Sequence, residues 1–179
     1  FAADVPDFAR RLIDAFWPGP LTLILPRRAG VGAAAAGGQD SIGLRCPSHP
    51  VAQALLRACA AQGVHGLAAP SANPFGRVSP TTAAHVQAGL GEALLVLDGG
   101  ACDVGIESTI VDCTRSAPVL LRPGGVSRAQ VEAASGQRLR ARDELATPAP
   151  RASGTLLAHY APSAPVRLMD AKALQTALD

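Results

Sequence analysis

The sequence predicts an α/β domain built on a twisted mixed sheet with flanking helices. Short apolar runs such as LTLIL (21–25) alternate with segments of helical periodicity such as DFARRLIDAF (7–16). The apolar runs at 107–113 and 118–123 are separated by only a few residues. A connection that short indicates an antiparallel pair, because a parallel pair needs a crossover of about a dozen residues or more. We therefore expect parallel and antiparallel pairs in one sheet.

The predicted helices begin near capping residues and end at glycine or proline. Asp7 is the expected N-cap of the first helix, and WPGP (17–20) ends it. Ser48 is the expected cap of the second, whose apolar residues are expected to face the core (Val51, Leu55, Leu56 and Cys59). In order, the predicted helices cover residues 7–16, 49–62, 81–90 and 127–135, and a further helix begins at Ala171.

The predicted strands are short apolar runs bounded by glycine, proline or polar residues. In order, they cover residues 21–25, 41–46, 65–70, 93–98, 107–113, 118–123 and 165–170. Between 137 and 164 the pattern gives way to Arg, Ala, Pro and Ser, a composition typical of linkers. We therefore expect three parts: a domain at 1–136, a linker at 137–164 and the beginning of a second domain at 165–179.

Composition excludes several classes of protein. Hydrophobic residues make up 48% and charged residues 17%, so most of the chain is expected to fold. The net charge of +2 is too small to predict a nucleic-acid partner. Fifteen Arg accompany a single lysine, Lys172, which excludes a P-loop lysine from the body of the chain. No CxxC, HExxH or GxSxG motif occurs, which disfavours zinc sites, zincins and serine hydrolases.

No signal peptide and no apolar run of the roughly 20 residues that a membrane span needs are visible, so we expect a cytoplasmic protein. The chain begins at Phe1 and enters a helical pattern almost at once. We therefore expect it to be a piece of a longer polypeptide.

Three segments carry candidate chemistry. The loop SANPFGRVSP (71–80) offers hydroxyls and an amide to a phosphate or carboxylate, or forms an ordinary turn. Arg45 and Arg122 each follow an apolar run shortly before a proline, where a guanidinium suits bidentate binding of an anion or a surface salt bridge. Ser108 and Thr109 begin an apolar run, next to carboxylates that could hold a cation or only face solvent (Asp98, Asp103 and Glu107).

Five segments together resemble one family: FWPGPLTLIL (16–25), IGLRCPSHPVAQALL (42–56), AAPSANPFGRVSPTTAAHV (68–86), LDGG (97–100) with GIESTIVD (105–112), and LLRPGGVS (120–127). They are similar to the YrdC-type threonylcarbamoyl-AMP synthase family. SGTLLAHYAP (153–162) resembles the linker of the two-domain form, which leads to a small Rossmann-like C-terminal domain. The resemblance covers residues 1 to about 135 and implies a YrdC-like catalytic domain that lacks its N-terminal part. The C-terminal domain would be cut off after its beginning.

The resemblance implies that L-threonine, bicarbonate and ATP form threonylcarbamoyl-AMP and pyrophosphate. The product supplies the t6A modification at position 37 of tRNA, so a functional link to the threonylcarbamoyl-transfer machinery is expected, and Mg²⁺ is expected to accompany ATP. The implied ATP-binding residues are Ser41, Ser71, Asn73, Ser79, Arg122 and Tyr160, with Tyr160 reaching back from the linker as a lid. The implied threonine-binding residues are Arg45, Ala69, Ser108 and Thr109, while Thr22 is expected to be structural.

The family's basic K-x-R motif does not occur in these residues. We therefore expect the 179-residue chain to be inactive alone. Two alternatives remain: a double-stranded RNA or tRNA-binding maturation module without synthase activity, and a carbamoyltransferase domain that forms a carbamoyl-adenylate. The low net charge and the 3% aromatic content argue against the first. The absence of any CxxC pair and the HYAP-type linker argue against the second.

Overall fold

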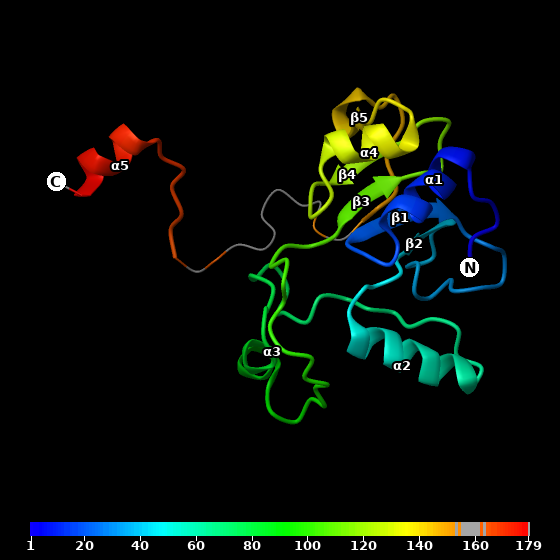
Figure 1. Cartoon of the computed structure of the whole chain (residues 1–179), viewed down its shortest axis with the longest axis horizontal. Coiled ribbons are helices and arrows are strands. Elements are labelled where there is room, and N and C mark those ends of the chain that lie inside the picture. The colour runs from blue at the N-terminus through cyan, green and yellow to red at the C-terminus, as the bar shows by residue number, and fades with distance from the viewer. Residues whose placement is uncertain (153, 155–161, 163, 179) are drawn as a thin grey trace.

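The computed structural model describes residues 1–152, 154, 162 and 164–178 (Figure 1). It contains a five-stranded sheet in the order β2-β1-β3-β4-β5. The strands are β1 (Leu21–Pro26), β2 (Ser41–Leu44), β3 (Thr109–Asp112), β4 (Val119–Arg122) and β5 (Arg140–Ala141). β1 pairs antiparallel with β2 and parallel with β3; β3 pairs antiparallel with β4, which pairs parallel with β5. The predicted mixed α/β sheet is confirmed.

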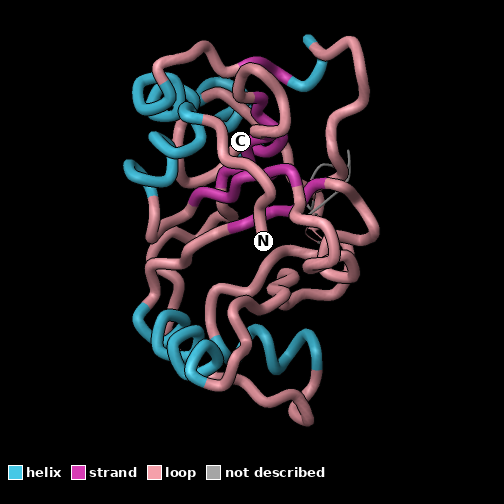
Figure 2. The backbone as a smooth tube through the Cα atoms, turned by 90° about the vertical axis from the view of Figure 1, so that its right-hand side faces the viewer, coloured by secondary structure: helices cyan, strands magenta, loops and turns pink. Residues whose placement is uncertain are grey.

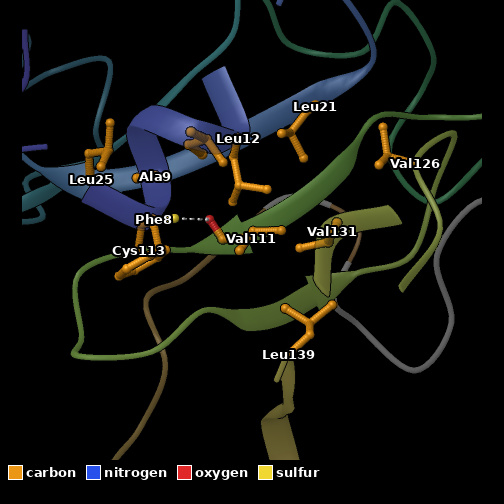
Figure 3. Packing of buried hydrophobic residues seen from close by; sticks show 11 residues of the cluster. Phe8, Ala9, Leu12, Leu21, Leu25, Val111, Cys113, Val126, Val131 and Leu139 are labelled. Carbon is orange, nitrogen blue, oxygen red and sulfur yellow. Dashed lines mark hydrogen bonds between the residues drawn. The ribbon is translucent and has the colours of Figure 1, made fainter. Parts of the chain in front are cut away.

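One face of the sheet is covered by two helices, α1 (Asp7–Phe16) and α4 (Arg128–Ser135), as Figures 1 and 3 show. Side chains alternate along a strand, so Leu21, Leu23 and Leu25 all point to this face. They pack with Leu12 of α1 and Val131 of α4 in the main hydrophobic core.

The opposite face carries a smaller cluster formed by the alternate residues of the same strands. Ile24 and Ile110 belong to it, and side chains from the stretch after β5 cover it, among them Leu145 and Ala149. Gly43 of β2 lies on this face as well, because a Cβ atom there would lie 3.2 Å from Ile24 and 3.6 Å from Thr22. This second face ends in polar residues at the beginning of β1, which is where the candidate site lies.

Two helices stand apart from the sheet, α2 (Pro50–Ala61) and α3 (Ala83–Leu90), as Figures 1 and 2 show. No residue between 43 and 107 is buried. The prediction that α2 packs its apolar side chains in a core is therefore wrong: Val51 is 36% and Leu55 39% exposed. Both helices nevertheless lie where the periodicity predicted them.

The predicted strands at 65–70, 93–98 and 165–170 are wrong, since none of these described segments is a strand. An apolar run becomes a strand only where a neighbour accepts its backbone hydrogen bonds. Both sides of β1 and of β3 are already taken by other strands.

Side chains cap several of the predicted helices, but neither of the two caps named above is correct. Ser127 caps α4 in a capping box with Gln130, and Gly136 ends that helix with a φ of 69°. Thr82 caps α3. The structure places Pro6 before α1 and His49 before α2, so the predicted caps Asp7 and Ser48 are wrong.

The stretch predicted as a linker contributes to the sheet. β5 lies within it, followed by a 3₁₀ turn, η1 (Arg142–Glu144), and Leu139 is fully buried in the main core. The final helix, α5 (Ala171–Leu178), begins at the predicted residue. The domain boundaries themselves stay a prediction. Within the described residues no helix combines the length and apolar character needed to cross a membrane.

Leu139→Ala is expected to lower the free energy of unfolding by about 2–5 kcal/mol, because it leaves a cavity beneath β5. Leu168→Ala is the matched control, since that side chain is fully exposed, and its effect should stay within about 0.5 kcal/mol. Urea denaturation measures both values. Equal effects would show that residue 139 does not pack in the core.

Candidate functional site

The candidate site lies at the edge of the sheet where β1 and β3 begin and where β2 and β4 end. The parallel register pairs Leu21 with Thr109, and this places the first residues of β1 and β3 side by side. β2 and β4 run in the opposite direction, so their last residues arrive at the same edge. Arg45 follows β2 directly, and Arg122 is the last residue of β4. The topology therefore brings both predicted arginines to one place.

Ser108 is the centre of the hydrogen bonds at this edge. Its Oγ lies 2.7 Å from Thr22 Oγ1. The guanidinium of Arg122 donates to the Ser108 carbonyl oxygen from Nη2 at 2.8 Å and from Nε at 3.1 Å. Nη2 also lies 3.2 Å from Ser108 Oγ. Arg122 is thus fixed over the beginning of β3.

The positively charged guanidinium of Arg45 donates a hydrogen bond to a neutral carbonyl group. Its Nε donates to the Gly19 carbonyl oxygen at 2.9 Å. Partial burial of the side chain, and secondly the positive charge of Arg122, lower the pKa of Arg45. A nearby anion would offset the mutual repulsion of the two guanidinium groups, so the edge is suited to bind a carboxylate or a phosphate.

The turn after β4 touches the backbone of β3. A Cβ atom at Gly124 would collide with the Glu107 carbonyl oxygen and lie 2.5 Å from the Thr109 nitrogen. Only glycine permits this close approach. Gly125 N donates to the same Glu107 carbonyl at 3.2 Å. The sequence LRPGG therefore fixes the position of Arg122 relative to Ser108.

The hydroxyl group of Thr109 makes its hydrogen bonds with the backbone of a following loop. Its Oγ1 donates to Val126 O at 2.7 Å and accepts from Val126 N at 2.9 Å. The residue is 1% exposed. These contacts give Thr109 a structural role, and its expected contact with threonine stays a prediction.

A cavity of about 410 Å³ lies between the 71–80 loop and α3, and Asn73, Ser79 and His85 contribute to its wall. Asn73 Nδ2 donates to the carbonyl oxygens of Pro74 and Arg77 at 3.0 and 2.9 Å. Its Oδ1 is buried and has no partner in the described part of the chain. The amide therefore presents an unused acceptor beside the cavity.

A hydrogen bond between Ser79 and Glu107 connects this cavity to the edge of the sheet. Ser79 Oγ donates to the carboxylate of Glu107 at 2.5 Å. Glu107 immediately precedes Ser108, so the cavity lies next to the group that holds Arg122.

The remaining predicted site residues are not gathered at this edge. Ala69 and Ser71 are exposed, and among the described residues neither hydrogen-bonds to the arginine pair. Ser41 lies opposite Pro26 at the far end of β2, about 13 Å along the strand from Arg45. It lines a second cavity of about 550 Å³, together with Arg115. Tyr160 lies outside the described residues.

Sequence reasoning did not give a site role to Thr22, Gly124, Arg77 or His85. A threonine within an apolar strand and an arginine within a loop rich in hydroxyls are the signals that could have indicated Thr22 and Arg77. No group of three or more His, Cys, Asp or Glu residues suited to a metal ion occurs in the described part of the chain.

The fold and this edge define an α/β domain with two arginines at one edge of its sheet. Residues 1–124 match the family model Sua5_yciO_yrdC, whose description is "Telomere recombination". The chain belongs to this family, which confirms the resemblance inferred from its motifs. Residues 126–179 match the model of the threonylcarbamoyl-AMP synthase C-terminal domain.

Known proteins agree with this assignment. The chain is 38% identical over 173 residues to a threonylcarbamoyl-AMP synthase of Pyrococcus abyssi, covering 94% of this chain and 49% of the relative. It is 39% identical over 172 residues to the Bacillus subtilis enzyme of the same name, covering 92% and 47%. The crystal structure of P. abyssi Sua5 complexed with L-threonine superimposes with a TM-score of 0.84 at 36% identity, covering 98% of this chain and 52% of that one. The chain thus spans about half the length of these relatives.

Gly124→Ala is expected to lower the free energy of unfolding by about 1–3 kcal/mol, because the added methyl group has no space beside β3. Gly89→Ala makes the same chemical change within α3, where the new Cβ would lie 3.4 Å from Pro74, an ordinary contact. That control should be neutral or stabilising by up to about 1 kcal/mol. Urea denaturation compares them, and an equal loss in both variants would contradict the close approach at Gly124.

Proposed function

We propose that the full-length protein is an L-threonylcarbamoyladenylate synthase, a nucleotidyltransferase. The observation that carries the proposal is the pair Arg45 and Arg122, held by carbonyl oxygens at one edge of the sheet beside Ser108. This edge suits two anionic reactants, a carboxylate and a nucleotide phosphate. The names of the relatives and the threonine complex of P. abyssi Sua5 support this reading.

In the proposed reaction the amino nitrogen of threonine and bicarbonate give a carbamate and water. A carbamate oxygen then attacks the α-phosphorus of ATP. The bond from that phosphorus to the oxygen bridging toward the β-phosphorus breaks, and pyrophosphate leaves with the bonding electron pair. No covalent enzyme intermediate is needed, so the side chains act by positioning the reactants and by stabilising negative charge.

The residues divide between the two substrates. Arg45 binds the threonine carboxylate, and Ser108 orients the amino acid beside it. Ala69 contributes its backbone to that pocket, with Thr109 as a further threonine contact.

The nucleotide occupies the other side of this edge. Arg122 contacts the nucleotide next to Ser108, and Ser71, Asn73 and Ser79 line the phosphates or ribose. Ser41 adds a nucleotide contact further along β2, and Tyr160 covers the ATP.

Mg²⁺ fits this site as an ion carried on the ATP phosphates. Mg²⁺ keeps several waters and takes one or two oxygen ligands from the protein. Asn73 Oδ1, which has no partner among the described residues, is an oxygen atom of this kind at the cavity, and the Glu107 carboxylate is another, next to Ser79 of the cavity wall. When bound, the ion would neutralise charge on the phosphates.

We further propose that the protein acts in the cytoplasm and supplies the t6A37 modification of tRNA, with residues 1–136 as catalytic domain, 137–164 as linker and lid, and 165–179 as the beginning of a Rossmann-like domain. The four cysteines are all free, which fits a reducing compartment.

The function is tested by pyrophosphate release from the full-length protein. Release should require L-threonine, bicarbonate and ATP together, and omission of any one should abolish it. Release with carbamoyl phosphate in place of threonine and bicarbonate would identify a carbamoyltransferase instead. Binding of tRNA without nucleotide and without any release would identify an RNA-binding module.

Arg45→Lys is expected to raise the KM for L-threonine at least about tenfold, because lysine is a point charge and cannot form the two parallel hydrogen bonds of a guanidinium. The KM for ATP should change less. Arg10→Lys is the control, since Arg10 is exposed on α1. Steady-state kinetics measure both constants, and an unchanged threonine KM in the Arg45 variant would refute its assignment.

A further inference from the structure

Thr22, near the beginning of β1, makes a contact with the candidate site that the roles above leave unused. Its Oγ1 lies 2.7 Å from the Oγ of Ser108, a residue that is only 8% exposed. Side chains alternate along a strand, so Thr22 lies on the same face of the sheet as Ile24. The contact therefore crosses the parallel pair, from β1 to the residue immediately before β3.

The branched side chain of Thr22 has one orientation between its two neighbouring strands. β1 lies between β2 and β3 in the sheet. The hydroxyl of Thr22 points to Ser108 on the side of β3. Its methyl group lies on the side of β2, where a Cβ atom at Gly43 would be 3.6 Å from Cγ2. A β-branched side chain is stiff at χ1, so threonine holds this hydroxyl in one direction more firmly than serine could.

The partners of the two hydroxyl groups limit the direction of the hydrogen bond between them. Ser108 Oγ also lies 3.2 Å from Arg122 Nη2, a group that can only donate. Within the described residues the Thr22 hydroxyl has Ser108 Oγ as its one hydrogen-bond partner. When Thr22 donates, Ser108 Oγ accepts from both neighbours, and the hydrogen of Ser108 can be donated to a ligand. When Ser108 donates to Thr22 instead, it presents only a lone pair to a ligand.

The charge of the site selects between these two arrangements. Arg45 and Arg122 suit this edge of the sheet to an anion. A carboxylate accepts hydrogen bonds and cannot donate one, so a lone pair of Ser108 would repel it. Only the arrangement in which Thr22 donates gives the anion a further hydrogen bond.

We propose that Thr22 is a positioning residue, which donates to Ser108 Oγ and thereby directs the Ser108 hydroxyl to an oxygen atom of bound L-threonine. The proposal rests on the proposed function, in which Ser108 orients this substrate. Thr22 acts through Ser108 and is not itself a ligand of the substrate.

The first test is the binding of L-threonine to the full-length protein without ATP, measured by calorimetry. Thr22→Val keeps the branched shape and removes the hydroxyl, so binding should weaken about three- to tenfold, the range expected for one hydrogen bond. Thr22→Ser keeps the hydroxyl and loses the stiff branch, so its affinity should lie between those of Thr22→Val and the wild type. Unchanged or tighter binding in Thr22→Val would overturn the proposal.

Thr114→Val is the matched control, because it makes the same chemical change beyond the other end of β3. Thr114 Oγ1 also donates over 2.7 Å, in this case to the carboxylate of Asp112. The partner is fully buried, so the variant should unfold at a lower urea concentration. Its affinity for L-threonine should stay within about twofold of the wild type. An equal loss of affinity in both variants would show a general loss of structure and would refute the positioning role.

The second test is the steady-state kinetics of pyrophosphate release. In Thr22→Val the KM for L-threonine should rise, while the KM for ATP should change less, because Ser108 is assigned to the amino acid. Equal increases in the two constants would contradict an action through Ser108.

The two tests separate the positioning role from the proposed function. Binding of L-threonine that depends on Thr22, in a protein that releases no pyrophosphate, would support the role and refute the synthase. Synthase activity together with wild-type threonine affinity in Thr22→Val would do the opposite.

Discussion

The parallel pairing of β1 with β3 is the constraint on which the site depends. It joins segments 86 residues apart and sets Thr22 against Ser108. Each of these strands then takes an antiparallel neighbour, which returns the chain to the edge where β1 and β3 begin. With all four strands parallel, β2 and β4 would end at the other edge of the sheet, far from Ser108. The mixed topology is therefore the reason that two arginines distant in sequence share one site.

The arginines at the two ends of β3 have different partners. Arg45 donates to the carbonyl oxygen of Gly19, and Arg122 donates to the carbonyl oxygen of Ser108. Arg115 instead pairs at 3.1 Å with the fully buried carboxylate of Asp112 and also donates to Thr147 and Pro148. The charge of Arg115 is compensated by a carboxylate within the fold, which gives this arginine a structural role. Arg115 thus stabilises one end of β3, while the arginines that we propose to bind substrates lie at the other end.

Local signals were sufficient to predict the helices and the inner strands. The capping box at Ser127 and the glycine at 136 act over a few residues, and periodicity placed α2 almost to the residue. Burial of α2 and strand formation at 93–98 depend on partners that are distant in sequence. Apolar character alone therefore gave wrong predictions for both segments. β5 was missed because it has two residues and forms only by pairing with β4.

Some residues of the candidate site could likewise be predicted from local sequence, whereas others depend on distant partners. Arg45 and Arg122 were recognisable from their places at strand ends, because a strand end is defined locally. The place of Thr22 in the site depends on its contact with Ser108 across the parallel pair. The place of Glu107 depends on its contact with Ser79, 28 residues earlier. No pattern within either segment encodes those partners. Motif resemblance supplied the residues of the 71–80 loop, but their relation to the sheet follows only from three-dimensional contacts.

Different interactions fix the cavity and the sheet edge that carries Arg45 and Arg122. The edge rests on buried residues such as Thr109 and on the close approach at Gly124. The cavity belongs to a stretch without buried side chains, where single polar contacts fix the geometry: Ser79 to Glu107, His49 to the Gly99 carbonyl, and Cys102 N to the Thr81 carbonyl. Such exposed contacts contribute little to global stability but determine where the donors lie. The cavity can therefore shift at small energetic cost, while buried contacts fix the edge that carries Arg45 and Arg122.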